Sequence, residues 1–209
     1  GVAPLNCLPK TAWPPTSNLA SPATFFSAAK TMELMNADPK AVLAVMDSCV
    51  AHCPQPISAD NAPYVLERAQ MNMNAGEYRS AMLDYDTYFK AVDGQVNDVF
   101  YYYREQAEFK ARQYQRALDD IAKAIELNPK ELTYRAEQAV INLRVGRYEE
   151  ALKVLDEVLA IDPKYAEAYR LKGICLIQLK KQEGACANFA KAKELGDANV
   201  DELIKKHCK

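Results

Sequence analysis

The residues best suited to chemistry in this 209-residue chain are Cys49, His52 and Cys53, which stand within five positions of one another. Thiolates and imidazole bind Zn²⁺, and a cysteine paired with a histidine can act as a nucleophile on acyl groups. A structural zinc site would need a second pair of ligands, and His207-Cys208 is the pair that the chain offers. The spacing of the first three residues also lets them share the apolar stripe of one helix, which is the interpretation we favour. We therefore predict no metal site, no cofactor and no catalytic residues.

Other catalytic signatures are missing from the sequence. It has two histidines, no glycine-rich phosphate-binding loop and no Gly-x-Ser-x-Gly motif. The charge is nearly balanced, with 26 basic against 28 acidic residues, so a nucleic-acid partner is not expected. No apolar run reaches about 18 residues, so we predict no transmembrane segment in this chain.

The composition of the chain and the positions of its prolines predict helices. Glycine is rare, whereas five of the eleven prolines fall in the first 22 residues, so residues 1–20 are predicted to form an extended arm. Ser21-Pro22 and Asp38-Pro39 are start signals for two helices near 22–35 and 39–53, within a hairpin that spans 21–57. One stripe of the second helix is apolar and must face a core. It consists of Val42, Val45, Met46, Cys49, Val50 and Cys53.

From Asn61 onward the sequence repeats itself. The segments that begin at Tyr78, Tyr114, Tyr148 and Gln182 align, and the alanine in each lies 36, 34 and 34 residues after the previous one. A period of this size is typical of stacked helix-turn-helix units, none of which can bury its apolar face without a neighbour.

The repeated positions resemble those of tetratricopeptide-repeat proteins over about 140 residues, from Asn61 to Asp197. The small first-helix residue is Ala69, Ala139 or Gly173, and the turn glycine is Gly76 or Gly146. The second helices carry Ala81, Ala117, Ala151 and Ala185, each followed four residues later by Tyr85, Ile121, Leu155 and Phe189. Asn128-Pro129 and Asp162-Pro163 close the two middle units. The resemblance implies an all-α, right-handed superhelical solenoid of helix-turn-helix repeats with a C-terminal capping helix.

The resemblance also implies a division of the chain. Residues 58–197 would hold four units, at about 61–96, 97–130, 131–164 and 165–197. The hairpin at 21–57 would be a divergent N-terminal cap, and residues 198–209 would form the C-terminal capping helix. Several features depart from the family pattern. Glu105 stands at the small position of the second unit, Tyr88 replaces a small residue in the first, and Asp93 and Asp197 replace the closing proline in the first and last units. A usually apolar first-helix position is also polar throughout. That position holds Arg68, Arg104, Gln138 and Lys172.

Two of the six cysteines are well placed to pair. Cys186 directly follows the last second-helix alanine, at a place that faces the next element, and that element carries Cys208. We predict a Cys186–Cys208 disulfide in an oxidising compartment, the alternative being two half-buried thiols. A weaker second candidate joins Cys7 to Cys49 or Cys53, whereas Cys175 is predicted to be a core thiol. The pairing favours an exported or periplasmic location over a cytoplasmic one, with any signal peptide removed before Gly1.

In tetratricopeptide arrays the first helices line an inner groove where peptides or helices bind, so the resemblance implies a groove here. The residues that would face it are Leu66, Gln70, Met73, Tyr102, Gln106, Phe109, Lys110, Val140, Leu143, Arg144, Arg170 and Ile174. Tyr102, Phe109, Arg144 and Arg170 are the predicted anchors, although each could instead pack between neighbouring helices.

The subfamily that clamps chaperone tails binds a terminal carboxylate with a Lys, Asn and Arg set. The matching positions here are Leu66, Gln70, Tyr103, Thr133 and Glu137. That role is not expected. The predicted function is a scaffold or adaptor that binds a peptide or protein segment in the groove. The alternative is a structural module that self-associates through its terminal faces, and an enzyme ranks third.

Overall fold

The structure, a computed structural model, describes residues 21–208, and within this range every regular element is helical. The chain divides into two compact units, residues 1–95 and 96–209, which we treat separately. The first unit contains α1 (Pro22–Leu34), α2 (Pro39–Ala51), α3 (Ala62–Ala75) and α4 (Tyr78–Ala91). The second contains α5 (Asp98–Lys110), α6 (Tyr114–Leu127), α7 (Leu132–Arg144), α8 (Tyr148–Ile161), α9 (Ala166–Gln178), α10 (Gln182–Glu194), the 3-10 turn η2 (Ala198–Val200) and α11 (Asp201–His207). The prediction of an all-α repeat fold is confirmed.

Local sequence explains where the helices begin and end. At the start of α2 the Asp38 carboxylate accepts a hydrogen bond from the Ala41 amide at 3.2 Å, and Pro39 occupies the first helical position. This helix ends at Ala51, two residues before the predicted end, because Pro54 disfavours helical backbone at the residue before it. Gly146 ends α7 with a φ of +82°, a left-handed conformation that glycine adopts without strain.

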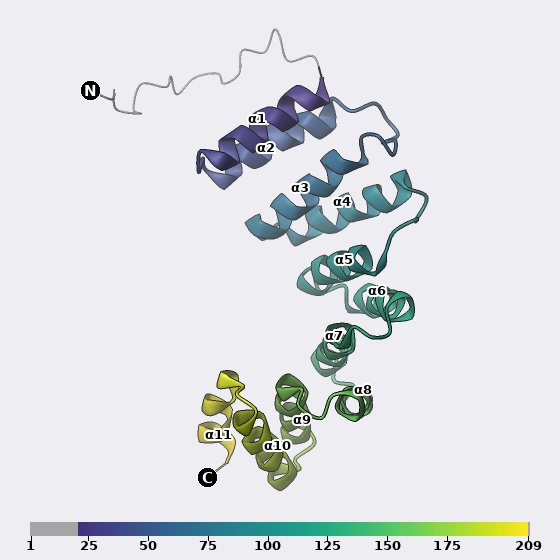
Figure 1. Ribbon diagram of the computed structural model, residues 1–209. Helices are drawn as coiled ribbons and strands as arrows, with labels where there is room; N and C mark the ends of the chain where they lie inside the picture. The colour runs from purple at the N-terminus through teal and green to yellow at the C-terminus, as the bar shows by residue number, and fades with distance from the viewer. Residues whose placement is uncertain (1–20, 209) are drawn as a thin grey trace, which may run out of the picture. The chain divides into compact units, whose positions relative to one another are not determined.

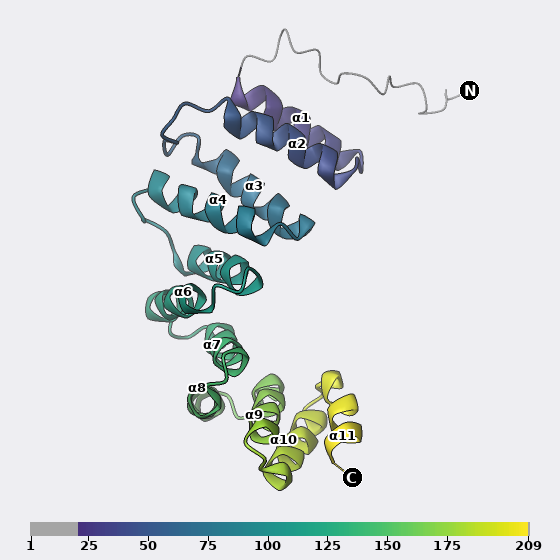
Figure 2. The same cartoon turned by 180° about the vertical axis from the view of Figure 1, so that it is seen from behind.

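The first unit consists of two helical hairpins. Helices α1 and α2 lie side by side, as do α3 and α4, and α2 packs against α3 (Figures 1 and 2). The predicted apolar stripe of α2 forms the centre of this packing: Met46 and Cys49 are fully buried with Ala29 of α1 and Met71 of α3 around them. Residues 21–57 thus form a hairpin whose second helix is covered on its apolar side.

The second unit repeats the hairpin three times. Helices α5 and α6, α7 and α8, and α9 and α10 pack in pairs, and α6 contacts α7 while α8 contacts α9 (Figure 1). The repeated second-helix alanines Ala117, Ala151 and Ala185 are completely buried, as are the large residues four positions later. Each hairpin therefore shares its core with its sequence neighbours, as expected of a repeat protein.

The small first-helix position is required by packing, as Gly173 shows. A Cβ atom placed on Gly173 would lie 2.3 Å from Cε1 of Phe189, the buried aromatic residue of α10. No real Cβ approaches another carbon this closely, so the ring of Phe189 occupies the space that a side chain at position 173 would need.

The C-terminal cap is shorter than predicted and begins with a turn. The sequence predicted a capping helix over 198–209, whereas the structure has η2 followed by α11, Asp201–His207. Val200 is fully buried against Phe189, Ala185 and Ala192. The structure joins Cys186 of α10 to Cys208 by a disulfide, with Cα atoms 5.5 Å apart, so the predicted pair links the cap to the last hairpin.

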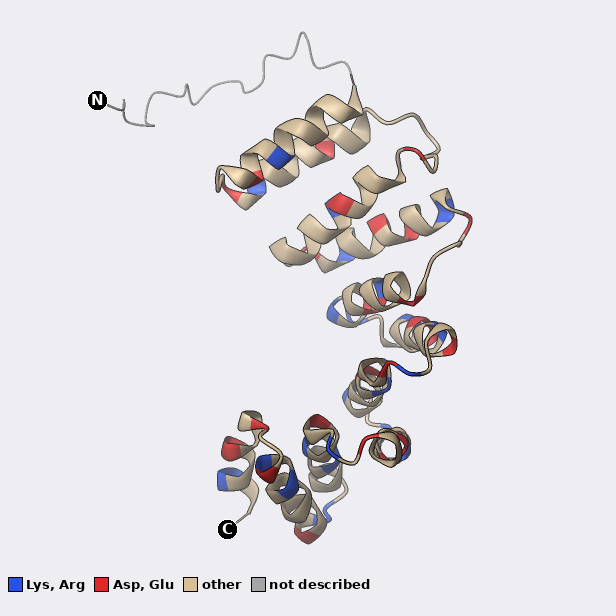
Figure 3. Ribbon diagram, in the orientation of Figure 1, with Lys and Arg blue, Asp and Glu red and all other residues tan. Residues whose placement is uncertain are grey.

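Charge is distributed differently in the two units. The helices of the first unit are largely uncharged, whereas basic and acidic residues are interspersed along those of the second (Figure 3). None of the helices between residues 21 and 208 is both long and apolar enough to cross a membrane.

Candidate functional site

The predicted groove residues of the second unit lie on α5, α7 and α9, and none of them is fully buried. Lys110 and Arg144 are exposed, and the others are half-buried. Val140, Leu143 and Ile174 pack at the edge of the core formed by α7, α8 and α9. These three side chains thus contribute to stability. Tyr102 and Phe109 likewise pack against the core that contains Ile121 and Tyr134, as the alternative interpretation expected, and each remains partly exposed. In the first unit, Leu66 and Met73 are half-buried on α3, and the exposed Gln70 donates weakly to Asn74.

Two contacts connect α5 with α7 on this face. The rings of Tyr102 and Tyr134 have centroids 5.2 Å apart, and the Arg144 guanidinium lies 5.9 Å from the centroid of Phe109. An arginine over an aromatic ring is held by a cation–π attraction, and the two groups together present a flat, partly apolar surface. Three of the four predicted anchors, Tyr102, Phe109 and Arg144, therefore belong to one continuous face of the second unit.

The fourth predicted anchor, Arg170, forms ion pairs within the protein. Its Nε donates to Asp197 Oδ2 at 2.7 Å and its Nη2 donates to Glu167 Oε1 at 2.5 Å. Asp197, which stands where the family usually has a closing proline, ends the turn after α10. Arg170 thus ties α9 to the start of the cap, and its guanidinium is less available to a partner than the sequence suggested.

Glu137 is a half-buried residue of α7 that was not among the predicted anchors. Burial raises the pKa of its carboxyl, the charge of Glu167 raises it further, and Lys110 opposes the shift. The charge of Glu137 also raises the pKa of a tyrosine on each of two other elements. Burial raises the pKa of Tyr102 on α5, and the charge of Glu137 raises it further. Burial also raises the pKa of Tyr165, at the start of α9, with further contributions from Glu167, Glu131 and Glu137. The Glu137 carboxylate therefore lies near enough to both phenols for its charge to raise their pKa.

A second carboxyl, that of Glu105, is buried beneath this face. Glu105 is 1% exposed, and within residues 21–208 its Oε2 has no hydrogen-bond partner. Burial raises its pKa to about 8, with further contributions from Glu137, Glu108 and Asp120. Glu108, one turn later, is equally buried but lies 2.8 Å from Nε of Arg116. Glu105 is thus a neutral carboxylic acid at pH 7, at a position where the other repeats have alanine or glycine.

Only Glu105 has a signal in the sequence, because it interrupts an otherwise small column, whereas Glu137 and Tyr165 stand at different repeat positions. Their proximity depends on how α5, α7 and α9 pack, which the repeat spacing alone does not specify.

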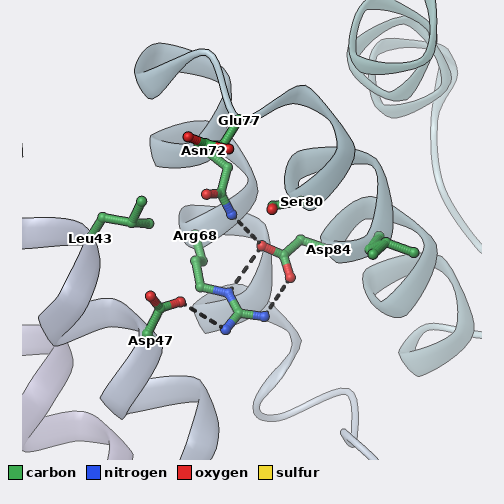
Figure 4. Close-up of a pocket in the computed structure, with 8 residues that line it drawn as sticks. Leu43, Asp47, Arg68, Asn72, Glu77, Ser80 and Asp84 are labelled. Carbon is green, nitrogen blue, oxygen red and sulfur yellow. Dashed lines mark hydrogen bonds and ion pairs between the residues drawn. The ribbon is translucent and has the colours of Figure 1, made fainter. Parts of the chain in front are cut away.

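The first unit has an open pocket of about 390 Å³ between α2, α3 and α4, shown in Figure 4. Arg68 lies at its base and donates from Nε and Nη2 to the two carboxylate oxygens of Asp84, at 3.0 and 2.6 Å. Nη1 donates to Asp47 of α2 at 3.2 Å, and Asn72 donates to Asp84 at 2.9 Å. The remaining lining residues are Leu43, Glu77, Ser80 and Leu83. The polar groups at the base are paired with one another, so the network mainly joins the two hairpins.

The same kind of contact explains the polar first-helix column. Arg104 donates from Nε and Nη2 to Asp120 of α6, at 2.6 and 2.8 Å, and Asp120 lies 16 residues later, as Asp84 does after Arg68. Lys172 instead donates to Asp156 of the preceding hairpin at 2.5 Å. These three side chains hold helices together through ion pairs, where the family usually uses apolar contacts. No contact explains Gln138.

The cysteine–histidine–cysteine group does not have the geometry of a reactive site. Cys49 and Cys53 are buried, and burial raises the pKa of Cys49 to about 11, so its thiol stays protonated at neutral pH. The Cys49 thiol donates to the Pro22 carbonyl at 3.1 Å, and the exposed His52 ring stacks on Phe25. Within residues 21–208, no group of three or more potential ligands could hold a metal ion.

Of the remaining cysteines, Cys49, Cys53 and Cys175 lie within the described residues and Cys7 does not. Cys175 is completely buried in the core of the second unit, as expected of a core thiol. The structure has Cys49 and Cys53 as free thiols. Their predicted partner, Cys7, lies outside the described residues, and so does the predicted arm at 1–20.

Comparison with known proteins places the chain in a family. Two tetratricopeptide-repeat family models match residues 106–166 and 142–194. Over 96 residues the chain is 30% identical to small glutamine-rich tetratricopeptide repeat-containing protein 2 of Mycosarcoma maydis, a match that covers 46% of this chain and 27% of that protein. It is 35% identical over 104 residues to serine/threonine-protein phosphatase T of Trypanosoma brucei brucei, covering 49% and 22%. The chain thus spans about a quarter of the length of these relatives.

Solved structures share the fold. YrrB, a tetratricopeptide-repeat protein with a peptide-binding site, superposes with a TM-score of 0.68 at 20% identity, over 90% of this chain and 94% of that one. MamA superposes with a TM-score of 0.67 at 17% identity, over 90% and 96%. Together with the repeat positions and the hairpin packing, the two family models identify the chain as a tetratricopeptide-repeat protein, and the solved structures share its fold.

Proposed function

We propose that this chain is a protein-interaction scaffold that binds an extended peptide on the face formed by α5, α7 and α9. The observation that carries the proposal is the exposed Arg144, whose guanidinium lies over the half-buried ring of Phe109, with Tyr102 about two turns earlier on α5. Large rigid side chains and arginine are enriched at binding hot spots because they bury much area at low entropic cost. The inner helices of a repeat protein offer such a face along several units, which suits a segment of extended chain.

The chemistry of the face argues against a peptide that ends in a carboxylate at its centre. Glu137 stands at one of the positions where a clamp for such a terminus would need a cation, and it would repel the carboxylate. The proposal assigns no catalytic residue to the chain. The match to phosphatase T covers only 22% of that protein, and no phosphatase activity is transferred from it.

Selection of peptides from a random phage-displayed library tests the proposal. Wild-type protein is expected to enrich a family of related peptides, and the variant Tyr102→Ala, Phe109→Ala, Arg144→Ala is expected to lose that enrichment. The matched control is Leu127→Ala, Arg147→Ala, Ile161→Ala, which alters three exposed residues on or beside α6 and α8. Enrichment of the same peptides by both triple variants would show that the face is not the binding site.

Self-association is a second candidate, supported by one observation. Leu34 and Met35, at the end of α1, are 85% and 61% exposed, which is unusual for two neighbouring large apolar residues. If copies associate through this end, light scattering will show a mass that rises with concentration and a loss of that rise in Leu34→Ser, Met35→Ser. A constant monomer mass in the wild type would eliminate this candidate.

A further inference from the structure

The open pocket of the first unit, between α2, α3 and α4, has a volume of about 390 Å³, which is within the range of small-ligand sites. Its base is a network that links all three helices. Arg68 of α3 donates to Asp84 of α4 and to Asp47 of α2 (Figure 4). The walls of the pocket are therefore held in place by contacts within the protein.

One buried side chain in this pocket carries an oxygen without a partner. Asn72 is 5% exposed, and its Nδ2 donates to Asp84 at 2.9 Å, which fixes the orientation of the side-chain amide. The Asn72 Oδ1 therefore points away from Asp84, and no hydrogen bond to it is formed within residues 21–208 (Figure 4). A buried carbonyl oxygen without a hydrogen bond costs free energy. A ligand that donates an N–H group to Asn72 Oδ1 would remove this cost.

The next repeat shows what fills the equivalent space there. Four of the residues that line the pocket have a counterpart 36 residues later: Arg68 and Asp84 correspond to Arg104 and Asp120, Asn72 to Glu108, and Ser80 to Arg116. In that repeat Nε of Arg116 lies 2.8 Å from Oε1 of the buried Glu108. The much shorter Ser80 replaces this arginine in the first unit, where the pocket is open. The pocket thus corresponds to the place of an arginine side chain in the following repeat.

The other groups that line the pocket suit a cation with an apolar stem. Asp47, Glu77 and Asp84 contribute three carboxylates, against the single guanidinium of Arg68. Glu77 is exposed, and within the described range its carboxylate has no cationic partner. Leu83 is 61% exposed and offers an apolar surface to the methylene groups of a long basic side chain. An anion would instead be repelled by the carboxylates.

We propose that this pocket binds an arginine side chain of a protein partner. The guanidinium donates to Asn72 Oδ1 and to the carboxylates of Asp47 and Glu77, and its methylene stem lies along Leu83. A guanidinium suits three separate acceptors better than an ammonium does, because its N–H donors are spread over a fixed plane. Residues 1–20 contain no arginine, so this part of the chain cannot supply the group. The site is separate from the face formed by α5, α7 and α9 and does not depend on peptide binding there.

An NMR titration of the nitrogen-15-labelled protein tests this inference. The probe is N-acetyl-arginine amide, and the controls are its citrulline and lysine analogues, of which citrulline has nearly the same shape as arginine but no charge. The arginine probe is expected to shift the side-chain amide of Asn72 and the backbone amides of Glu77 and Ser80, with a midpoint of about 1 mM. The citrulline analogue is expected to bind about tenfold more weakly, because it forms no charge-assisted hydrogen bonds. The lysine analogue is also expected to bind more weakly than the arginine probe.

A matched pair of variants separates occupation of the pocket from a change in overall charge. Ser80→Arg introduces the residue that the next repeat has at this position, so it fills the pocket from within and is expected to abolish the shift of the Asn72 amide. Ser27→Arg makes the same change at an exposed position on α1 and is expected to keep the wild-type response. The spectrum of each variant checks that it folds. Equal binding of the arginine probe and either analogue, shifts confined to residues outside the pocket, or unchanged binding by Ser80→Arg would overturn the inference.

Discussion

The substitution Glu105→Gln offers a direct test of how a buried acid affects the stability of the second unit. Glu105 is 1% exposed, and burial, followed by Glu137, Glu108 and Asp120, raises its pKa from 4.5 to about 8. The folded protein therefore keeps this carboxyl protonated at pH 7, whereas the unfolded chain ionises it. Glutamine has nearly the same shape and cannot ionise, so it removes this difference without opening a cavity.

The sign and size of the effect follow from proton linkage. Below about pH 4.5 both states hold the proton, and above about pH 8 neither does. Between these values only the folded state holds it, so the free energy of unfolding of the wild type falls as the pH rises. The slope is about 1.4 kcal/mol for each pH unit, which gives a loss of roughly 3 kcal/mol by pH 7 and roughly 5 kcal/mol over the whole interval. Glu105→Gln is expected to lack this loss.

The measurement is urea unfolding followed by circular dichroism between about pH 5 and pH 8 at constant ionic strength. The stability of Glu105→Gln minus that of the wild type should increase steadily across this range. Any fixed cost of the buried amide shifts the whole curve and leaves its slope unchanged. Glu126→Gln, at a side chain that is 66% exposed, is the control and should show no such trend.

Two results would refute the reasoning. A difference between Glu105→Gln and the wild type that stays constant with pH would mean that Glu105 ionises normally in the folded protein. A difference that grows as the pH falls would mean that Glu105 has a partner that stabilises its charged form.

Three further predictions concern contacts elsewhere in the chain. Arg68→Met leaves the buried carboxylate of Asp84 without its cationic partner and should lower the free energy of unfolding by about 3 kcal/mol in urea titrations. Adding Asp84→Leu should recover most of the loss, and no recovery would show that the pair matters for another reason. Cys186→Ser removes the disulfide that closes a loop of 22 residues and should destabilise the cap by about 3 kcal/mol. The expected observation is faster hydrogen exchange in α11. Unchanged exchange would argue that the bond to Cys208 is dispensable. Lys180 has a φ of +59°, so Lys180→Gly should raise the free energy of unfolding by about 1 kcal/mol, and a lower thermal midpoint would contradict this.

Much of the fold could be predicted from the sequence because it depends on contacts between residues near one another in the chain. The repeated alanines, the large residues four positions later and the turn glycines report the packing of one hairpin and its neighbour. The same logic placed Cys186 opposite Cys208, since the residue after each repeated alanine faces the next element. Helix α2 ends at Ala51, two residues before the approximate end expected from the sequence, because Pro54 disfavours helical backbone at Cys53.

The chemistry of the binding face could not be predicted in the same way. Repeat positions assigned Arg170 to the face as an anchor, but its guanidinium is bound to Asp197 and Glu167. The peptide-contacting role of the other groove residues stays a prediction that the peptide experiments can test.

The sequence by itself determined that the chain is built of helical hairpins, where most of them begin and end, and which residues form the shared core, because helical periodicity and a repeat of about 34 residues are local properties. Only the tertiary structure decided how polar side chains meet across helices. It paired Arg68 with Asp84, buried Glu105 without a partner for its Oε2 in the described range, and bound Arg170 to Asp197. These contacts depend on the direction and depth of single side chains at helix interfaces, and a repeat pattern does not encode either.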